Sequence, residues 1–323
     1  MKKIVFIIPY FGKFNNYFQL FLNSCEKNPD IDWLIFTDDK RSFNYPKNVI
    51  VNYISFYEIK NRFQSYFDFK IKLEFPYKLC DFKPTYGLVF EEYIKEYKFW
   101  GYCDTDLIWG NITKFITDKM ITDYDKIGIF GHCTIYRNTK YINNLFKKSF
   151  NGLEIYKKVY TSNQGYAFDE EFNNSINNIF EQENLKIYYR EMQANIYTKS
   201  SDFRLTSLNK DRKTYSIEKN KKAFFVWDNG HLYRYIYIDD KVEKNEYLYI
   251  HMQSRKMNIN LLNINISKFK IIPNSFDELE VFEVNKKNFY NIRRKYFNLH
   301  YFKLRSKNLY IKIKHRLTGY YNS

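Results

Sequence analysis

Two aspartates, Asp104 and Asp106, stand one residue apart at the end of the apolar stretch FWGYC (99–103). A carboxylate is costly to bury unless a cation or hydrogen bonds compensate its charge. Residues i and i+2 of an extended segment project to the same side, so both carboxylates can face one cavity. Paired carboxylate oxygens suit Mg²⁺ or Mn²⁺, which also hold phosphate groups. The spacing therefore predicts a metal or phosphate site here.

Other interpretations of this pair remain open. Asp106 or Asn111 could simply cap the helix that follows the strand. In haloacid dehalogenase phosphatases the first aspartate of such a pair is a nucleophile. That motif follows the first strand and has Thr or Val two residues after the second aspartate, where this chain has Ile108. A phosphatase that uses Asp104 as its nucleophile stays an alternative.

The elements that must position the two acids follow from the apolar pattern. Continuous apolar runs predict buried strands, and apolar residues three or four apart predict helices. The alternation of the two over residues 1–130 predicts an α/β fold, and the Asp-Asn-Gly turn within 222–238 predicts a hairpin. The expected strands are 3–11, 32–39, 48–56, 99–103, 126–130 and 246–253. The expected helices are 15–28, several pieces within 57–98 including 86–97, and then 111–120, 140–160 and 169–184.

Composition indicates a folded protein with a basic surface. The 323 residues can bury a large core, and an aromatic content of 21% argues against disorder over most of the length. The four scattered cysteines have no metal-binding or redox spacing and are expected to be reduced thiols. The short apolar N-terminus lacks the features of a cleaved signal, and no stretch has the length of a membrane span. These features predict a cytoplasmic protein.

Residues 286–323 carry much of the net charge of +16, since they contain eleven Lys and Arg residues and no Asp or Glu. Aromatic and aliphatic residues are interleaved with the basic ones. This composition predicts a segment that binds an anionic membrane surface and makes the protein peripheral on the inner face of the membrane. A nucleic-acid-binding segment and a packed pair of helices are the alternatives. An AT-rich coding bias could account for part of the charge.

Six segments resemble one enzyme family in their order and spacing. They are IVFIIPYFG (4–12), TDD (37–39), KLCDFKPTYG (78–87), FWGYCDTDLIWG (99–110), IFGHCTIYRN (129–138) and YIHMQSRK (249–256). Together they resemble bacterial GT-A fold glycosyltransferases of capsule and O-antigen polysaccharide loci. The resemblance implies a Rossmann-like mixed sheet flanked by helices. It places a catalytic domain over residues 1–257 and an extension over 258–323 that is basic and largely helical from 286.

The resemblance also implies where a nucleotide-sugar donor binds. Asp106 would bind the metal directly, and Asp104 would bind the metal, the ribose or a metal-bound water. Either Asp38 or Asp39 would lie near the uridine. The residues expected to line the nucleotide pocket are Pro9, Tyr10 and Phe11. Those expected near the base, ribose or donor sugar are Lys78, Asp81 and Lys83.

His251 is the third candidate metal ligand. In several enzymes of this fold a histidine on a late strand completes the metal site, and His251 stands at such a strand end. The alternative is a histidine with a purely structural role. Histidine together with carboxylates and diphosphate oxygens favours Mn²⁺ slightly over Mg²⁺. Arg255 and Lys256 follow closely and are expected to neutralise the diphosphate as it leaves.

Sugar transfer also needs a base for the attacking hydroxyl group. YAFDEEF (166–172) places Asp169 and Glu170 at the expected start of a helix, with Asp169 the first candidate and Glu170 the second. Acidic residues in a first helical turn also stabilise the helix through its dipole, and this is the alternative to a catalytic role. His132 and Arg137 are expected to contact hydroxyl groups of the donor or acceptor, with Gly131 allowing close approach of the sugar. A strand-to-loop passage with solvated polar residues is the alternative for that segment.

With the resemblance included, the sequence predicts a metal-dependent hexosyltransferase that inverts the configuration at the transferred sugar. Its donor would be a UDP-sugar, with UDP-galactose or UDP-galactofuranose suggested by the resemblance alone. Its acceptor would be a surface polysaccharide or a lipid-linked glycan. A phosphatase and a basic nucleic-acid-binding protein are the alternatives from other functional classes.

Overall fold

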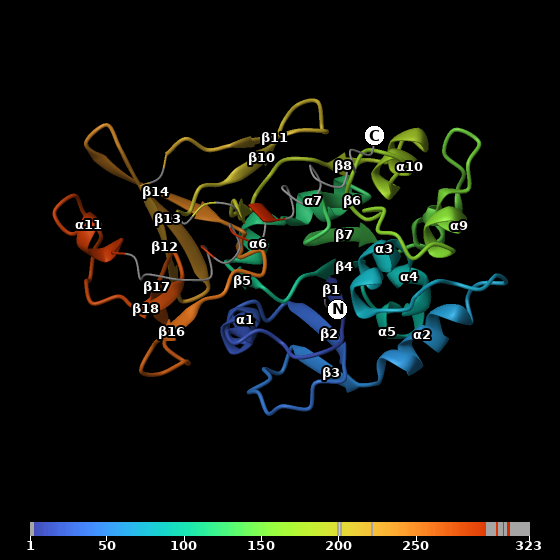
Figure 1. Ribbon diagram of the computed structural model, residues 1–323, viewed down its shortest axis with the longest axis horizontal. Coiled ribbons are helices and arrows are strands. Elements are labelled where there is room, and N and C mark those ends of the chain that lie inside the picture. The colour runs from blue at the N-terminus through green and yellow to red at the C-terminus, as the bar shows by residue number, and fades with distance from the viewer. Residues whose placement is uncertain are drawn as a thin grey trace.

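The computed structural model describes residues 3–198, 200, 202–220, 222–294, 302, 306, 309 and 310. Its centre is a seven-stranded sheet in the order β3-β2-β1-β4-β7-β6-β8 (Figure 1). Strands β1 to β4 run parallel, β7 is antiparallel to β4, and β6 is antiparallel to β7. The strands are β1 (Ile4–Tyr10), β2 (Ile31–Thr37), β3 (Val49–Tyr53), β4 (Phe99–Cys103), β6 (Lys126–Phe130), β7 (Cys133–Arg137) and β8 (Ile187–Tyr188).

Both faces of this sheet are covered, which explains the continuous apolar sequence of its central strands. In β1, Val5 and Ile7 belong to one hydrophobic core, whereas Phe6 and Ile8 belong to the other. The Val5 face is covered by α2 (Phe56–Gln64), α3 (Leu79–Phe82), α4 (Tyr86–Val89), α5 (Glu91–Ile94), α8 (Lys140–Asn143), α9 (Ile155–Tyr160) and α10 (Ile176–Gln182). The Phe6 face is covered by α1 (Phe18–Glu26), α6 (Ile112–Phe115) and α7 (Asp118–Asp123). Short 3₁₀ turns are η1 (Pro76–Lys78), η2 (Lys83–Thr85) and η3 (Leu145–Lys147).

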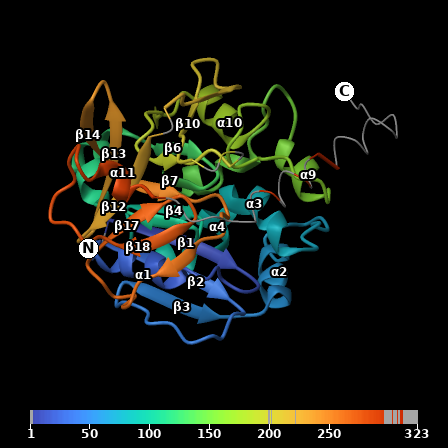
Figure 2. The same ribbon diagram turned by 60° about the vertical axis from the view of Figure 1, so that its left-hand side comes forward.

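A second sheet of six strands lies on one side of the molecule, and helices α2 and α9 lie on the other (Figures 1 and 2). Its order is β14-β13-β12-β17-β18-β16, so three strands from before residue 257 join three from after it. Helix α11 (Phe289–Ile292) packs against this sheet. The strands are β12 (Ala223–Asp228), β13 (His231–Ile238), β14 (Lys241–Tyr247), β16 (Asn258–Asn260), β17 (Lys268–Ile272) and β18 (Ser275–Glu278).

A small three-stranded sheet joins the two larger ones. It consists of β5 (Leu107–Trp109), β15 (Tyr249–His251) and β9 (Ala194–Asn195), with β15 in the middle. Trp227 of β12 donates a hydrogen bond to the backbone oxygen of Trp109 at 2.8 Å, which ties the six-stranded sheet to β5. A separate hairpin is formed by β10 (Thr206–Leu208) and β11 (Tyr215–Ile217).

The expected fold class is confirmed as a mixed α/β sheet flanked by helices, and the strands expected before residue 131 are present. The hairpin is also confirmed, because Asn229 and Gly230 adopt positive φ between β12 and β13. The helix expected over 86–97 is divided at Phe90 into α4 and α5, and that over 140–160 into α8, η3 and α9. The helix expected over 169–184 begins only at Ile176, so Asp169 lies in a turn before it.

Most of the extension expected to be helical from 286 lies outside the described residues, which include 286–294 and four later positions. Among the described residues no helix combines the length and apolar character needed to cross a bilayer. The four cysteines are free thiols, as expected.

Lys126 is a fully buried lysine at the first position of β6. Its amino group donates a hydrogen bond to Asn177 Oδ1, and the centres of the Tyr136 and Phe180 rings lie 5.3 and 5.6 Å from it. Burial lowers the pKa of Lys126 to about 7, against the weaker opposing effect of acidic neighbours. At mildly alkaline pH the amino group of Lys126 is therefore largely neutral in the folded protein and protonated in the unfolded chain.

Replacing Lys126 by methionine is expected to change how stability depends on pH. Above the folded-state pKa of about 7 the unfolded chain binds the extra proton, so the free energy of unfolding of the wild type rises with pH. The contribution of Lys126 to this slope approaches about 1.4 kcal/mol per pH unit as the pH rises above 7, and Lys126→Met removes it. Urea unfolding between pH 7 and pH 8.5 measures the slope, with Lys95→Met at an exposed position as the control. An unchanged slope in Lys126→Met would contradict this interpretation.

Candidate active site

Three strand ends bring the predicted metal ligands together. Asp104 follows the carboxyl end of β4, and Asp106 immediately precedes β5. Strand β15 pairs antiparallel with β5, with His251 opposite Leu107 in the register. The turn is held by a hydrogen bond from the amide of Asp104 to the backbone oxygen of His132 at 3.0 Å. The carboxyl edge of a parallel sheet is where open α/β folds bind ligands.

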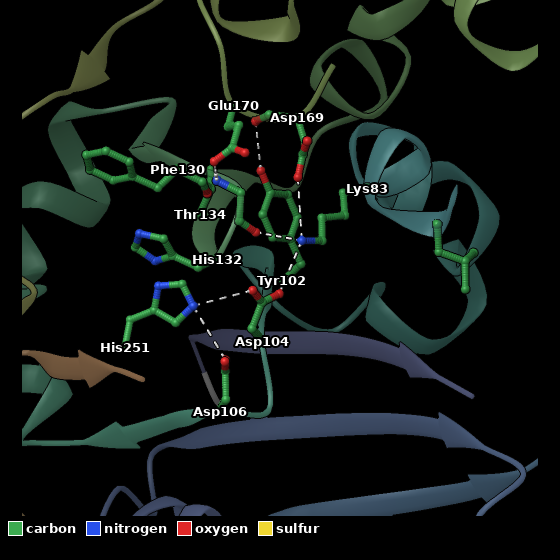
Figure 3. A network of polar contacts seen from close by, with 12 residues as sticks. Lys83, Tyr102, Asp104, Asp106, Phe130, His132, Thr134, Asp169, Glu170 and His251 are labelled. Carbon is green, nitrogen blue, oxygen red and sulfur yellow. Dashed lines mark hydrogen bonds and ion pairs between the residues drawn. The ribbon is translucent and has the colours of Figure 1, made fainter. Parts of the chain in front are cut away.

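Asp104, Asp106 and His251 form a compact group, here called the metal triad, in which one ligand atom from each lies within 4.8 Å of the others. His251 Nε2 lies 3.8 Å from Asp104 Oδ2 and 3.5 Å from Asp106 Oδ1 (Figure 3). Asp106 and His251 are 9% and 8% exposed. Within the described part of the chain the buried Asp106 Oδ1 accepts no hydrogen bond. Two carboxylates, an imidazole and an unsatisfied buried oxygen fit Mn²⁺ or Mg²⁺.

The charges of the metal triad compensate one another. Burial alone would raise the pKa of Asp106, but His251 and the amide of Ser254 outweigh it and hold the pKa below its ordinary value. Burial would lower the pKa of His251, but the carboxylates of Asp106 and Asp104 raise it instead. A histidine must be neutral to bind a metal, so a cation would take the place of the imidazole proton in this charge balance.

Lys83 connects the metal triad to a second acidic group. Its ammonium lies 3.3 Å from Asp104 Oδ1 and 3.5 Å from Asp169 Oδ2, and it donates a hydrogen bond to the backbone oxygen of Gly131 at 2.6 Å (Figure 3). Burial would lower the pKa of Lys83, but Asp104 and other neighbours raise it well above the ordinary value. The lysine is therefore a fixed positive charge between the two acids.

Asp169 and Glu170 lie against Gly131. Burial raises the pKa of Asp169 to about 7, with Lys83 opposing and Glu170 adding to the shift. Glu170 Oε2 accepts a hydrogen bond from the amide of Gly131 at 2.9 Å. A side chain at residue 131 would come within 2.8 Å of Asp169 Oδ2, so the glycine lets these acids approach the backbone. Close approach of a sugar at Gly131 stays a prediction.

Two cavities meet at the metal triad. The one here called the basic cavity has a volume of about 960 Å³, and the charged side chains that line it are Lys13, Lys83, Arg255, Lys256, Asp104 and Asp106. The one here called the acidic cavity has a volume of about 1310 Å³ and is lined by Lys78, Lys83, Lys158, Asp81, Asp104, Asp106, Glu154, Asp169 and Glu170. Cations exceed acids in the first, and acids exceed cations in the second. Both include Lys83 and the two carboxylates of the metal triad.

The residues expected around the donor occupy both cavities. Pro9, Tyr10 and Phe11, at the carboxyl end of β1, line the basic cavity together with Arg255 and Lys256. Arg255 donates a hydrogen bond to the backbone oxygen of Ser200 at 2.6 Å, and burial lowers its pKa to about 10. Residues far apart in the chain thus form one wall of this cavity, and their contact with a nucleotide stays a prediction.

Lys78 and Asp81 form a buried ion pair of 2.7 Å in the wall of the acidic cavity. Asp81 also accepts hydrogen bonds from the amides of Tyr166 and Phe168, at 3.1 and 3.2 Å. The pair therefore positions the segment that leads into Asp169, in addition to lining the cavity.

Asp38, Asp39 and Arg137 are not among the residues that line either cavity. Asp38 accepts a hydrogen bond from the amide of Gly12, and the carboxylate of Asp39 pairs with Arg41, whose hydrogen bond lowers the pKa of Asp39 to about 2. Arg137 pairs with Asp125 and lies opposite Phe99, at the amino end of β4. It is thus at the other end of the strand from Asp104, and the expected contact with sugar hydroxyls does not fit this location.

His132 does line the acidic cavity and packs beside the metal triad. Its ring centre is 4.3 Å from that of His251, and its Nδ1 is hydrogen-bonded to the hydroxyl of Tyr249 at 2.9 Å. Burial and the neighbouring His251 lower the pKa of His132 well below its ordinary value, so the ring is neutral. Among the described residues its Nε2, which is buried, has no hydrogen-bond partner.

One family model covers most of the fold and the whole site. Residues 6–280 match the model of a family of unknown function, DUF6625. The chain belongs to the DUF6625 family. The match runs from β1 through β18, so the metal triad, both cavities and the six-stranded sheet are all within the DUF6625 region.

Solved structures similar to this DUF6625 chain include two of the galactosyltransferase LgtC. One is LgtC in complex with donor and acceptor sugar analogues, with 13% identity and a TM-score of 0.33 over 60% of this chain and 75% of that one. The other is an active-site mutant of LgtC, with 12% identity and a TM-score of 0.32 over 60% and 74%. Structural similarity at this level does not assign the activity of LgtC to this chain. No protein with a curated description matches the DUF6625 chain.

Asn195 is a residue of the DUF6625 site that the sequence did not indicate. Its Oδ1 lies 3.0 Å from His251 Nδ1 and accepts a second hydrogen bond from Gln253 Nε2 at 2.6 Å. Since this oxygen only accepts, His251 Nδ1 carries the hydrogen and Nε2 faces the carboxylates. Asn195 comes from the two-residue strand β9, and no local pattern reveals that such a strand pairs with β15.

Asn195→Ala is expected to weaken Mn²⁺ binding about 10- to 100-fold, because the partner that orients a ligating histidine is lost. The measurement is the Mn²⁺ affinity from titration followed by electron paramagnetic resonance. Asn173→Ala, at an exposed asparagine of the same cavity, is the matched control and should bind Mn²⁺ like the wild type. Asn195→Asp, which keeps an acceptor oxygen, should bind better than the alanine variant. Equal affinities for all four proteins would contradict the role of Asn195.

Proposed function

We propose that this chain is a metal-dependent glycosyltransferase that moves a sugar from a nucleotide-diphosphate donor to a glycan acceptor. A UDP-sugar is the proposed donor, with UDP-galactose or UDP-galactofuranose the first to test, and a surface polysaccharide or lipid-linked glycan is the proposed acceptor. One observation carries the proposal. The metal triad lies at the carboxyl edge of the central sheet, between a basic cavity and a cavity that holds Asp169 and Glu170.

The positively charged side chains of the basic cavity support its role as the site of the nucleotide diphosphate. Lys13, Arg255 and Lys256 lie in its walls, and cations beside a diphosphate stabilise the negative charge that develops on it. Tyr10 offers an aromatic face for a base at the end of β1. Asp104, Asp106 and His251 would hold Mn²⁺ or Mg²⁺, which when bound supplies Lewis acidity toward the diphosphate oxygens.

The acidic cavity would then receive the acceptor. A carboxylate whose pKa lies near neutrality can accept a proton from a hydroxyl group as that group attacks the sugar. Asp169, with its pKa of about 7, has this property and lines the cavity, and Glu170 lies beside it. Lys83 holds Asp169 in place and keeps it close to the metal triad. With one of these acids as the base, inversion at the anomeric carbon is the expected stereochemistry.

The proposal is tested by incubating the protein with a panel of nucleotide sugars and Mn²⁺, and measuring release of the nucleoside diphosphate. Slow hydrolysis of one donor, removed by EDTA and restored by Mn²⁺, is the expected result. Release of inorganic phosphate from phosphomonoesters, with a covalent aspartyl intermediate trapped at Asp104, would instead support the phosphatase alternative.

We also propose that the enzyme acts in the cytoplasm, held on the inner face of the membrane by residues 286–323. The support is their composition, since eleven cations without a single acid suit anionic lipid. Binding to vesicles that contain phosphatidylglycerol, and its loss on deletion of residues 295–323, is the expected behaviour.

A further inference from the structure

The acidic cavity is larger than one sugar requires. Its volume of about 1310 Å³ exceeds the range of about 300–1,000 Å³ that is usual for small-molecule sites. Its inner end contains the metal triad, Asp169 and Glu170, where transfer would take place. Other parts of its wall come from Phe75, Leu153 and Tyr215, and its volume has room for further parts of an acceptor.

Large apolar side chains are exposed along the walls of this cavity. Phe75 is 41% exposed, Tyr77 80%, Leu153 62% and Tyr215 47%, and all four line the cavity. They come from three separate segments: the entry to η1, the loop before α9, and β11. Exposed apolar surface gathered at one cavity indicates a binding site. Flat aromatic rings suit the C–H faces of sugar rings, because they present a large rigid apolar area.

The charges of the cavity disfavour an anionic ligand. Lys78 is paired with Asp81, and Lys83 with Asp104 and Asp169, so these cations are already neutralised. Lys158 lies 5.7 Å from the centre of the Tyr166 ring and faces a cavity that also contains Glu170 and Glu154, of which Glu154 pairs with Lys157. The basic cavity has the opposite charge balance. The acidic cavity therefore departs from the net charge of the whole chain, which is +16.

We propose that the acidic cavity binds an uncharged oligosaccharide of two or more sugars as the acceptor. Its terminal hydroxyl would lie at Asp169 and Glu170, and the following sugars would pack on Phe75, Leu153 and Tyr215. This inference rests on the proposed function, since it names the acceptor class of the same site. In this proposal exposed aromatic and aliphatic residues recognise the acceptor, whereas charged residues would recognise an anionic glycan.

The test is binding of the full-length protein, with Mn²⁺ and UDP present, to an array of neutral glycans and of uronate- or phosphate-containing glycans. Neutral glycans of two or more sugars should bind best, and single sugars should bind weakly. Tyr215→Ala and Phe75→Ala should each weaken that binding about tenfold, from the loss of one stacking contact. Tyr57→Ala is the matched control, since Tyr57 is 71% exposed on α2 and is not part of the cavity wall.

Calorimetric binding of UDP with Mn²⁺ to the same variants separates this inference from the proposed function. UDP affinity should be the same in Tyr215→Ala, Phe75→Ala and the wild type. If UDP binds but anionic glycans are preferred, if no glycan binds, or if both variants bind neutral glycans like Tyr57→Ala, the inference is overturned while the proposed function stands. If the wild type binds no nucleoside diphosphate, the proposed function itself fails.

Discussion

Asp106→Asn is expected to lower the rate of sugar transfer and of donor hydrolysis by about 10²–10³-fold, the usual cost of removing one group that stabilises transition-state charge. Asparagine has nearly the same shape, so the turn between β4 and β5 should be retained. It has no negative charge, however, and one end of its amide would direct N–H groups at a cation. Because Asp106 is buried and its Oδ1 accepts no hydrogen bond from the described residues, water cannot readily replace the missing carboxylate.

The measurement for Asp106→Asn is nucleoside diphosphate release over a range of Mn²⁺ concentrations, alongside the free energy of unfolding. Asp118→Asn is the matched control, since Asp118 is an exposed acid that pairs with Lys3 and lines neither cavity. The control should keep wild-type rates. Wild-type rates in folded Asp106→Asn would contradict the assignment of the metal triad.

Asp169→Asn is expected to lower kcat by about 10²–10⁴-fold, the usual contribution of a general base. Donor binding should change little, because Asp169 lines the acidic cavity and is not part of the basic one. The wild-type kcat should also depend on pH. Burial raises the pKa of Asp169 to about 7, and only the ionised carboxylate can accept a proton, so kcat should fall tenfold per pH unit below that value.

The pH profile separates a base from a structural acid. Asp169→Asn should lose the fall in kcat below about pH 7, whereas a residue that only shapes the cavity would leave the profile unchanged. Glu170→Gln is the companion variant, and if Glu170 is the base, that variant takes the larger loss. The configuration of the product at the anomeric carbon, measured by NMR, should be inverted. If Asp169→Asn and Glu170→Gln both kept the wild-type kcat and its pH dependence, neither acid would be the base.

The sequence predicted the central strands, and the strand-end positions of the metal triad residues, because both depend on local patterns. Asp104 and Asp106 end an apolar strand, and His251 ends another, so their positions at strand ends could be inferred. That the two ends meet depends on the pairing of β15 with β5. The sequence indicated this only through the order of motifs in a known family.

Arg137 and Asp169 show what the sequence could not reveal. Arg137 ends β7, but β7 runs antiparallel to β4, so its last residue lies at the far end of the sheet from Asp104. A strand pattern carries no information on direction. Asp169 and Glu170 precede an amphipathic segment and look like the first turn of a helix. Ala167 and Asn174 instead adopt positive φ, and the hydrogen bonds from the amides of 166 and 168 to Asp81 hold a turn there.

The most direct measurement of the central claim is calorimetric titration of UDP into the wild-type protein, with and without Mn²⁺. The metal triad and the basic cavity predict a one-to-one complex that forms with Mn²⁺, is lost in EDTA and is lost in Asp106→Asn, while Asp118→Asn binds like the wild type. Absence of binding by UDP and by every other nucleoside diphosphate, or UDP binding of equal strength without metal, would contradict it.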